Sequence, residues 1–334
     1  MLLLLLLLLL LLLLLLHCCC DCCRHRSCCR RHLPAAPRHP LNRRSLPALR
    51  AAAQFDVDDI DEAAHTINFG KGGYQGCRGG NGSDWYVENV LELLDDAREW
   101  YYDEAAHELY LQPNATHGVP PSAADLAGAA APALQTLVSV NATQAAPVAG
   151  LRFEGLGFRD AAPTYMEPHG VPSGGDWALE RRGAAFFEGT EGLVVDGCSF
   201  ERNDGNGIML SGYTRNASVT NSHFAWTGGT AVAAWGRTDE LSDDGTRGWD
   251  GTGGDFPRWT TVEGNVMRET GIWEKQASCW FQAKTAQTTL RKNMCFNLAR
   301  AGFNFNDGKS LGGWAFNDRR ALLRGDAAAA HAFQ

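Results

Sequence analysis

Positive charge is scarce outside the first 54 residues of the sequence. The whole chain has 334 residues, 38 acidic and 30 basic, and a formal charge of −8. Residues 1–54 contain eight Arg and one Asp, a net charge of +7, so residues 55–334 carry −15. Proteins that bind a phosphate backbone need clustered Lys and Arg. The composition therefore excludes nucleic acid as the main partner.

Cysteine is scarce in the same region. Seven of the 11 cysteines lie between Cys18 and Cys29, with no room for the loops that separate ligand pairs in zinc sites. We interpret this tract as low-complexity sequence or a palmitoylated stretch, and expect no metal there. The other four could form one or two disulfides whose pairing the sequence leaves open: Cys77, Cys198, Cys279 and Cys295.

The sequence also lacks an apolar run long enough for a transmembrane helix. Leu2–Leu16 is fifteen consecutive Leu, which as a helix would span roughly 22 Å, less than the ~30 Å hydrocarbon core. Its length fits the apolar region of a signal peptide, although the basic residues after it would hold the chain in the cytoplasm. We expect membrane contact only through this segment, if it is not cleaved.

Four N-glycosylation sequons favour entry into the secretory pathway. They begin at Asn81, Asn114, Asn141 and Asn216. We therefore predict a secreted or cell-surface protein in which residues 1–54 are a signal or low-complexity segment. An incorrectly assigned N-terminus is the alternative.

A repeat typical of a solenoid begins near residue 148. Its template is an apolar residue, any residue, usually Gly or Asn, two more residues and an apolar residue. Copies start at Phe153, Val195, Val219, Val262 and Leu290. The shortest interval is about 24 residues, and two longer intervals indicate insertions within Asp160–Arg182 and Arg237–Arg258. Short strands with Gly and Asn at the corners predict an all-β, right-handed parallel β-helix over 148–308.

The flanking segments are less regular. We predict a mixed N-terminal region over 55–147, with a short helix near Val87–Leu94 and strands at Glu99–Asp103 and Glu108–Gln112. Residues 309–334 form an Ala-rich tail without the pattern of a capping helix. We therefore expect an incomplete solenoid.

Five long motifs resemble one known family. They are Asn68–Gly82, Trp100–Pro113, Phe158–Gly183, Met209–Gly236 and Lys275–Gly308. Together they are similar to secreted right-handed β-helix proteins of the pectin-lyase-like superfamily, over about residues 68–308. This family is largely uncharacterised. The resemblance implies the β-helix fold and a carbohydrate-linked role, without implying a reaction.

Strand alternation assigns side chains to the two faces of the repeat. Leu210 precedes Val219 by nine residues, and Phe281 precedes Leu290 by nine, which predicts that Leu210 and Phe281 share a register position. The predicted inward residues are Ile208, Leu210, Val232, Ala234, Cys279, Phe281, Phe303 and Phe305. The predicted outward residues are Met209, Ser211, Ala233, Trp235, Trp280, Gln282, Asn304 and Asn306.

The outward face is a candidate binding surface for a polysaccharide. Aromatic faces beside amides and hydroxyls suit sugar rings, which present apolar C–H patches and many hydroxyls. The predicted substrate-binding residues are Trp235, Trp280, Gln282, Asn304, Asn306 and Arg237. An ordinary solvated face is the alternative.

Candidate catalytic groups surround this face. Glycoside hydrolysis needs two carboxyl groups, whereas a polysaccharide lyase needs a base and a neutralising charge, often Ca²⁺. The predicted catalytic residues are Asp307, Glu274, Lys284 and His169. The first insertion also contains Tyr165, Glu167, Asp176, Trp177 and Arg181, and the second contains Asp239, Glu240, Asp243, Asp244, Asp250 and Asp255.

The catalytic assignment of His169 and the calcium assignment of Asp250–Asp255 both have structural alternatives. In the alternative for His169, its loop packs over the side of the helix and His169 binds a backbone carbonyl. Asp250–Asp255 offers oxygens for Ca²⁺ but lacks the ligand pattern of an EF-hand loop, so we predict no cofactor and no metal site.

We therefore predict a carbohydrate-active enzyme, a glycoside hydrolase or polysaccharide lyase, that acts on a polysaccharide along the outer face of a β-helix. A non-catalytic secreted or cell-surface glycan-binding protein is the alternative. The two differ in whether two carboxyl groups, or a carboxyl group and a base, converge on that face.

Overall fold

The computed structural model describes residues 54–73, 87–96, 99–112, 129–170, 172, 177–237, 239–240, 247–251 and 253–306. Nearly all of the predicted segment 1–54, the predicted tail 309–334, Cys77 and Asp307 lie outside these residues. Almost every regular element within them is a strand, apart from a short 3-10 helix at Leu91–Leu93. In the described part of the chain, no helix has the length and apolar character needed to cross a membrane.

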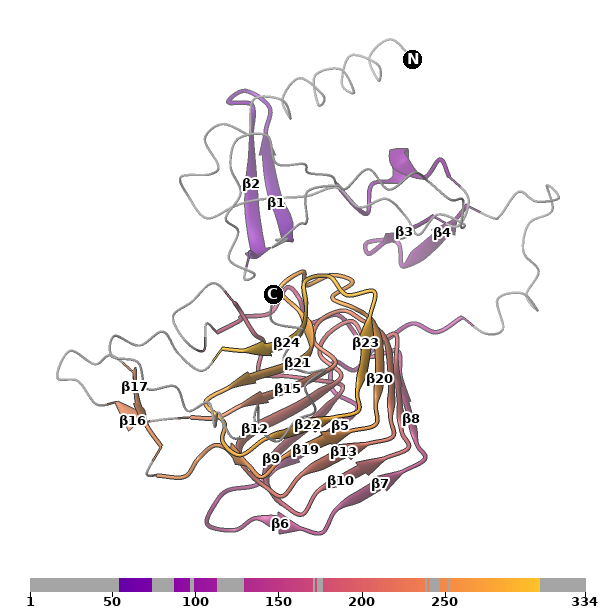
Figure 1. The fold of residues 1–334 in the computed structure, drawn as a ribbon. Helices are drawn as coiled ribbons and strands as arrows, with labels where there is room; N and C mark the ends of the chain where they lie inside the picture. Colours follow the sequence, from indigo (N-terminus) through magenta and orange to yellow (C-terminus); the bar gives the residue numbers. More distant parts are fainter. Residues whose placement is uncertain are drawn as a thin grey trace.

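Residues 138–305 wind into successive coils whose strands stack into three parallel sheets (Figure 1). One sheet contains β7 (Arg152–Glu154), β10 (Val194–Asp196), β13 (Ser218–Thr220), β19 (Thr261–Glu263) and β22 (Thr289–Arg291). The second contains β8 (Gly157–Arg159), β11 (Ser199–Glu201), β14 (His223–Thr227), β20 (Val266–Thr270) and β23 (Met294–Phe296).

The third sheet is the largest, with eight strands. Its main order is β5 (Val138–Asn141), β9 (Ala185–Glu191), β12 (Ile208–Arg215), β15 (Val232–Trp235), β21 (Ser278–Ala283) and β24 (Ala301–Phe305). Two short strands join it, β6 (Val148–Ala149) beside β9 and β18 (Pro257–Arg258) beside β12. The predicted parallel β-helix is thereby confirmed.

The five copies of the repeat lie side by side. Their first residues pair in one parallel ladder: Phe153, Val195, Val219, Val262 and Leu290. Two positions later every copy turns a corner with positive φ, at Gly155, Gly197, Asn221, Gly264 and Lys292. This left-handed conformation is least costly for Gly and Asn, which explains the residue preference of the template.

The interior of the solenoid is built from stacked apolar side chains. Phe200 lies between Phe158 and Phe224, with ring centroids 4.8 Å from each. This spacing equals the separation of neighbouring strands, so each coil adds one ring to the stack. Burial raises the pKa of the Cys279 thiol, which lies beside Cys295. Cys198, Cys279 and Cys295 are all free thiols.

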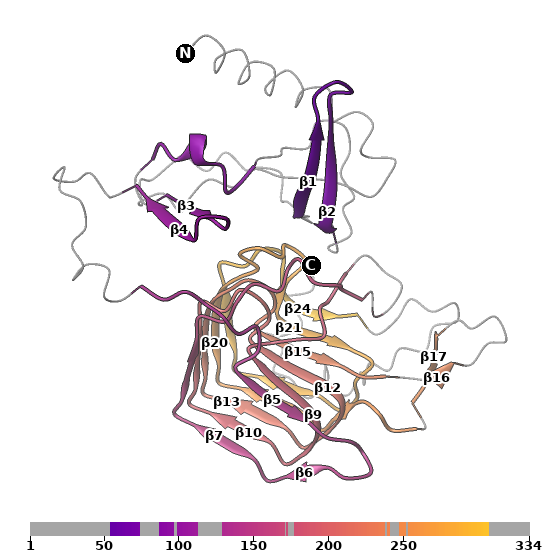
Figure 2. The ribbon, with the colours of Figure 1, turned by 180° about the vertical axis from the view of Figure 1, so that it is seen from behind.

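Two antiparallel hairpins precede the solenoid (Figures 1 and 2). The first pairs β1 (Phe55–Asp61) with β2 (Thr66–Gly72), and the second pairs β3 (Trp100–Asp103) with β4 (Glu108–Leu111). The strands predicted over 99–112 are therefore confirmed, whereas the predicted helix near Val87–Leu94 is only the single 3-10 turn.

The predicted register of β21 is wrong by one residue. Leu210 pairs with Ala234, and Ala234 pairs with Gln282 instead of Phe281. Because side chains alternate along a strand, this slip exchanges the two faces. Trp280 therefore points into the core, where its Nε1 donates a 3.0 Å hydrogen bond to Gln282 Oε1. Phe281 points outward.

A bulge in β12 causes this error. Ser211 and Thr214 pair with Glu188 and Thr190 of β9, so β12 contains one more residue than its neighbour over the same span. The bulge contains Gly212, whose backbone lies in the left-handed region with φ of 49°. The nine-residue spacing measured from β12 therefore corresponds to eight residues in β21.

Candidate functional site

The first insertion covers the outer face of the eight-stranded sheet. Leu179 is buried in an apolar cluster formed with outward residues of three strands. Those residues are Met209, Ala233, Trp235, Phe281 and Ala283. Gly170 and Leu179 exchange backbone hydrogen bonds of 3.0 and 2.9 Å, which pair the outgoing and returning parts of the insertion at this point. The centre of the predicted binding face is therefore covered by the chain itself.

Close packing at Gly170 predicts a measurable effect of adding one methyl group. A β-carbon at Gly170 would lie 2.3 Å from Cη2 of Trp235. We expect Gly170→Ala to lower the free energy of unfolding by about 1–3 kcal/mol, because overpacking displaces the insertion. Urea denaturation would measure this loss. Gly157→Ala is the control, since its nearest neighbour is the movable Ser199 Oγ at 3.3 Å; equal losses in both variants would contradict the packing.

Arg181, near the end of the first insertion, packs against Trp235. Its guanidinium lies 3.8 Å from the centre of the indole ring. It also donates hydrogen bonds to Ser211 Oγ at 3.0 Å and to the Trp235 carbonyl at 2.6 Å. One face of the Trp235 ring, which was predicted to bind a sugar, is thus covered by Arg181.

The predicted substrate-binding residues consequently separate into two groups. Trp280 and Gln282 lie in the interior, so their predicted outward orientation is wrong. Asn304 pairs with Phe281 in register and lies on the predicted outward side, half-buried, as does Asn306. Arg237 is the member with the greatest access to solvent, and it leads to the site described next.

An exposed group of charges lies where strands of the eight-stranded sheet end. Arg237 follows β15, and its guanidinium contacts Glu188 Oε2 at 2.9 Å and Asp255 Oδ2 at 3.4 Å. The side chains of Glu188, Arg237 and Asp255 are 20%, 45% and 42% exposed, respectively. We call these three residues the edge site. Unlike Trp235 and Phe281 at the covered centre of the face, Arg237 and Asp255 have side chains that are more than 40% exposed.

The two carboxyl groups of the edge site are close together. Asp255 Oδ1 and the carboxyl carbon of Glu188 lie 2.7 and 3.4 Å from the point that a β-carbon on Gly212 would occupy. Their separation therefore cannot exceed the sum of these distances, 6.1 Å. Burial raises the pKa of Glu188, but hydrogen bonds from Arg237 and Ser211 outweigh it and hold the pKa below its usual value. Glu188 is thus ionised near neutral pH.

Lys284 belongs to the same edge. Gly236 N donates a 3.0 Å hydrogen bond to Ala283 O, so Arg237 and Lys284 follow adjacent, paired residues of neighbouring coils. Glu274 precedes β21 whereas Lys284 follows it, and six strand residues span about 20 Å. Two of the predicted catalytic residues are therefore at opposite edges of the sheet.

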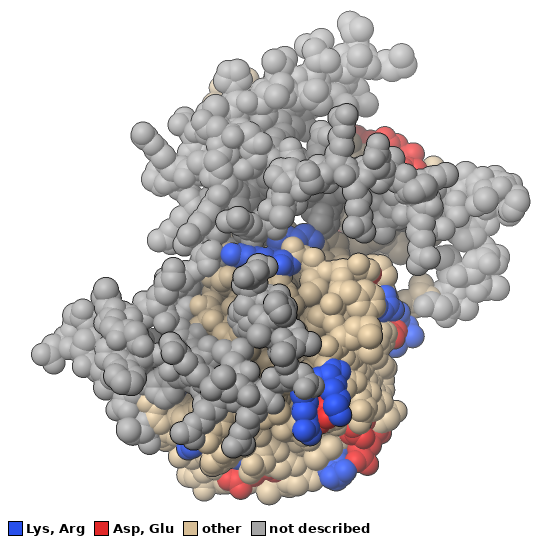
Figure 3. All heavy atoms as spheres, viewed as in Figure 1, with Lys and Arg blue, Asp and Glu red and all other residues tan. Residues whose placement is uncertain are grey.

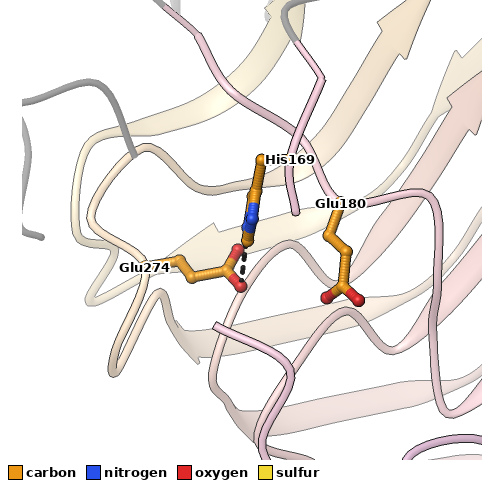
Figure 4. A group of neighbouring side chains, drawn as sticks. All are labelled: His169, Glu180 and Glu274. Carbon is orange, nitrogen blue, oxygen red and sulfur yellow. Dashed lines mark ion pairs between the residues drawn. The ribbon is translucent and has the colours of Figure 1, made fainter. Parts of the chain in front are cut away.

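A second group of ionisable side chains is buried at the opposite edge. Figure 4 shows His169 of the first insertion directed toward Glu274 of the loop between β20 and β21, with Glu180 of the same insertion beside them. One atom of each lies within 4.8 Å of the others. The side chains are 0%, 2% and 3% exposed for His169, Glu180 and Glu274. We call these three residues the buried cluster.

The hydrogen bonds of the buried cluster define the orientation of His169. Its Nδ1 lies 2.7 Å from the Glu167 carbonyl, and its Nε2 lies 3.1 Å from Glu274 Oε1. Burial lowers the pKa of His169, but Glu274 outweighs burial, so the pKa lies above its usual value. Burial and the charge of Glu274 raise the pKa of Glu180 to about 7.

Sequence reasoning identified His169 and Glu274 but missed Glu180 and Glu188. Glu188 had a usable signal, since it pairs with Ser211, which pairs with Trp235 in the outward column. Glu180 had none, because the path of an irregular insertion cannot be read from strand periodicity. The alternative interpretation of His169, packed over the side of the helix against a carbonyl, matches its contact with Glu167.

Comparison with known proteins gives a fold and no family. No family model matches the chain, and no curated protein matches it. A solved structure described as a "Glycoside hydrolase" is similar, with a TM-score of 0.51 and 15% sequence identity. The alignment covers 66% of this chain and 40% of that one, so this chain spans less than half of that structure's length. Similarity at this identity supports the fold alone.

Proposed function

We propose that this protein is a carbohydrate-active enzyme that cleaves a polysaccharide at the edge site. The observation that carries the proposal is the pair of neighbouring carboxyl groups of Glu188 and Asp255, bridged by Arg237 on an exposed edge of a parallel β-helix. Two carboxyl groups that flank one bond are the usual requirement of glycoside hydrolysis. The description of the structural neighbour as a glycoside hydrolase is compatible with this proposal.

The carboxyl separation is compatible with hydrolysis that retains configuration. Retaining pairs lie about 5–5.5 Å apart and inverting pairs about 6.5–9.5 Å apart, and Asp255 Oδ1 lies no more than 6.1 Å from the carboxyl carbon of Glu188. We take retention as the working mechanism, and the anomeric configuration of the product tests it. This mechanism requires Asp255 to carry a proton when the substrate binds. The ionised Glu188 attacks the anomeric carbon, and Asp255 gives its proton to the departing glycosidic oxygen and becomes a carboxylate. Asp255 then takes a proton from the water that releases the sugar from Glu188.

The basic residues of the edge suggest an anionic substrate. Arg237 and Lys284 lie on adjacent coils in a chain whose body is strongly acidic. On the described part of the face in Figure 3, basic and acidic side chains lie next to each other and form no broad basic patch of the kind that nucleic acid requires. A polysaccharide with spaced carboxylates, such as a polyuronate, would compete with Glu188 and Asp255 for Arg237 and place a carboxylate on the side of the sheet where Lys284 lies.

A panel of neutral and uronate-containing polysaccharides tests this proposal. We expect new reducing ends from a uronate-containing substrate, without the ultraviolet absorbance of an unsaturated product. Unsaturated product would instead indicate a lyase that uses Lys284 or Arg237 as the base. Binding without either product would overturn the enzyme proposal in favour of a glycan-binding protein.

We also propose an extracellular location for this activity. Asn141 and Asn216, which begin two of the four sequons, are both exposed. Their side chains are therefore accessible to a glycosyltransferase, as N-glycosylation in the secretory pathway would require. Their exposure supports secretion and is independent of the edge site.

A further inference from the structure

We infer that His169, Glu180 and Glu274 form a binding site for a divalent transition-metal ion, with Zn²⁺ as the best-matched metal. The inference concerns the buried cluster and does not depend on the proposed cleavage reaction. It rests on the geometry of the three side chains, the orientation of the imidazole and the lack of hydrogen bonds from other described residues to the buried carboxyl group of Glu180.

The donor atoms have the spacing of a small metal site. Zn²⁺ binds His nitrogen and carboxylate oxygen at about 2.0–2.2 Å, so ligands of a tetrahedral ion lie roughly 3.3–3.5 Å from one another. His169 Nε2 and Glu274 Oε1 are 3.1 Å apart, and all three donor groups lie within 4.8 Å. A shift of the Glu180 carboxyl group by at most about 1.3 Å would bring its two contacts, with His169 and Glu274, into range. One nitrogen and two carboxylates leave a fourth position for water.

The imidazole is oriented as a metal ligand would be. A carbonyl oxygen only accepts hydrogen bonds, so the 2.7 Å contact with Glu167 O places the ring proton on Nδ1. In the neutral ring the lone pair of Nε2 then points at the carboxylate of Glu274, a repulsive contact unless a cation or a second proton lies between them. Metal-bound histidines commonly donate their other N–H to a backbone carbonyl in this way.

Glu180 supplies an independent indication. Its side chain is 2% exposed, yet neither of its carboxylate oxygens has a hydrogen-bond partner among the described residues. The nearby Thr164 hydroxyl likewise has no hydrogen-bond partner among the described residues. Arg182 Nε lies 3.5 Å from Oε1, but that arginine is itself 46% exposed to solvent. Buried carboxylates without hydrogen bonds are costly, and in proteins they pair with charges or coordinate metals.

The charge of the cluster also suits a divalent ion, because two carboxylates and a neutral imidazole carry a total charge of −2, which balances the +2 charge of the ion. Imidazole in the donor set favours a transition metal over Mg²⁺ or Ca²⁺. The same ion would join the first insertion to the loop before β21, which lie 94 residues apart in sequence from Glu180 to Glu274.

The surrounding backbone makes room for the cluster. A β-carbon on Gly229 would lie 2.9 Å from Glu274 Oε2 and 2.7 Å from Asn206 Oδ1, so Glu274 occupies space that any other residue at position 229 would restrict. Asn206 in turn donates to the backbone carbonyl of Glu180 at 3.0 Å. The backbone at Glu180 is therefore hydrogen-bonded to Asn206 of the neighbouring coil, and Gly229 leaves the space that Glu274 occupies.

Metal analysis of the full chain tests the inference without an activity assay. We expect one Zn²⁺ per chain after equilibration and gel filtration, and an increase in Tm when Zn²⁺ is added to chelator-treated protein. His169→Ala and Glu180→Gln should each weaken Zn²⁺ binding at least 100-fold. The matched control is Glu201→Gln, which alters an exposed His–Glu pair with His223 at 3.5 Å and should keep wild-type binding.

A second measurement on the wild-type protein covers the case in which a variant does not fold. X-ray absorption of the Zn²⁺-loaded chain should show nitrogen and oxygen ligands only. Sulfur ligands would place the metal at cysteines and overturn the inference. A protein without stoichiometric Zn²⁺ and with an unchanged Tm would also overturn the inference, because the cluster would then share protons instead of a metal. Full retention of Zn²⁺ by folded Glu180→Gln would overturn it as well.

Discussion

Replacement of Glu188 by Gln is expected to lower kcat on the cleaved polysaccharide by about 10³-fold or more. The variant keeps the shape of the side chain but removes the negative charge that the proposed mechanism uses as nucleophile, and loss of such a group typically costs about 10² to 10⁴-fold or more. The charge is held in place by Arg237 at 2.9 Å. Release of reducing ends, followed over time at saturating substrate, measures the loss.

Glu154→Gln provides the control for this experiment. Glu154 is an exposed glutamate on β7 that pairs with Arg152, in a different sheet from the edge site. We expect this variant to keep wild-type activity. If folded Glu188→Gln retained more than about a tenth of the activity, Glu188 would not be a catalytic residue.

Replacement of Trp280 by Ala is expected to lower the free energy of unfolding by about 3–5 kcal/mol. The indole is 0% exposed and lies in the interior beside its register neighbours Val232 and Phe303. Removing a buried aromatic ring costs its transfer free energy plus that of the cavity left behind. Urea denaturation followed by far-ultraviolet circular dichroism, which does not depend on the lost tryptophan, measures the change.

This variant also distinguishes the observed register from the one that sequence periodicity predicts. On the predicted outward face the same substitution would change stability by about 0.5 kcal/mol or less. Phe296→Ala is the comparison, because Phe296 is an aromatic strand residue that is 40% exposed. A loss at Trp280 no larger than the loss at Phe296 would contradict the inward orientation.

The course of the solenoid could be predicted because a local sequence repeat determines it. Each copy of the template combines an apolar residue for the interior with a corner residue that adopts positive φ, as at Gly197 and Asn221. Both requirements act within a few residues of the chain, so spacing alone placed Val195, Val219 and Val262 side by side. The same reasoning failed in β21, because the bulge at Gly212 is a local change that the repeat does not reveal.

The candidate sites likewise have features that the sequence predicts and features that only the packing reveals. Strand period and coil length are enough to predict the parallel β-helix, the outward column containing Trp235 and the basic edge formed by Arg237 and Lys284. The three-dimensional packing was needed to show that the first insertion covers the centre of this face and brings Glu180 to Glu274. That meeting depends on how an irregular loop packs over side chains from other coils, and no periodicity within the chain encodes such packing.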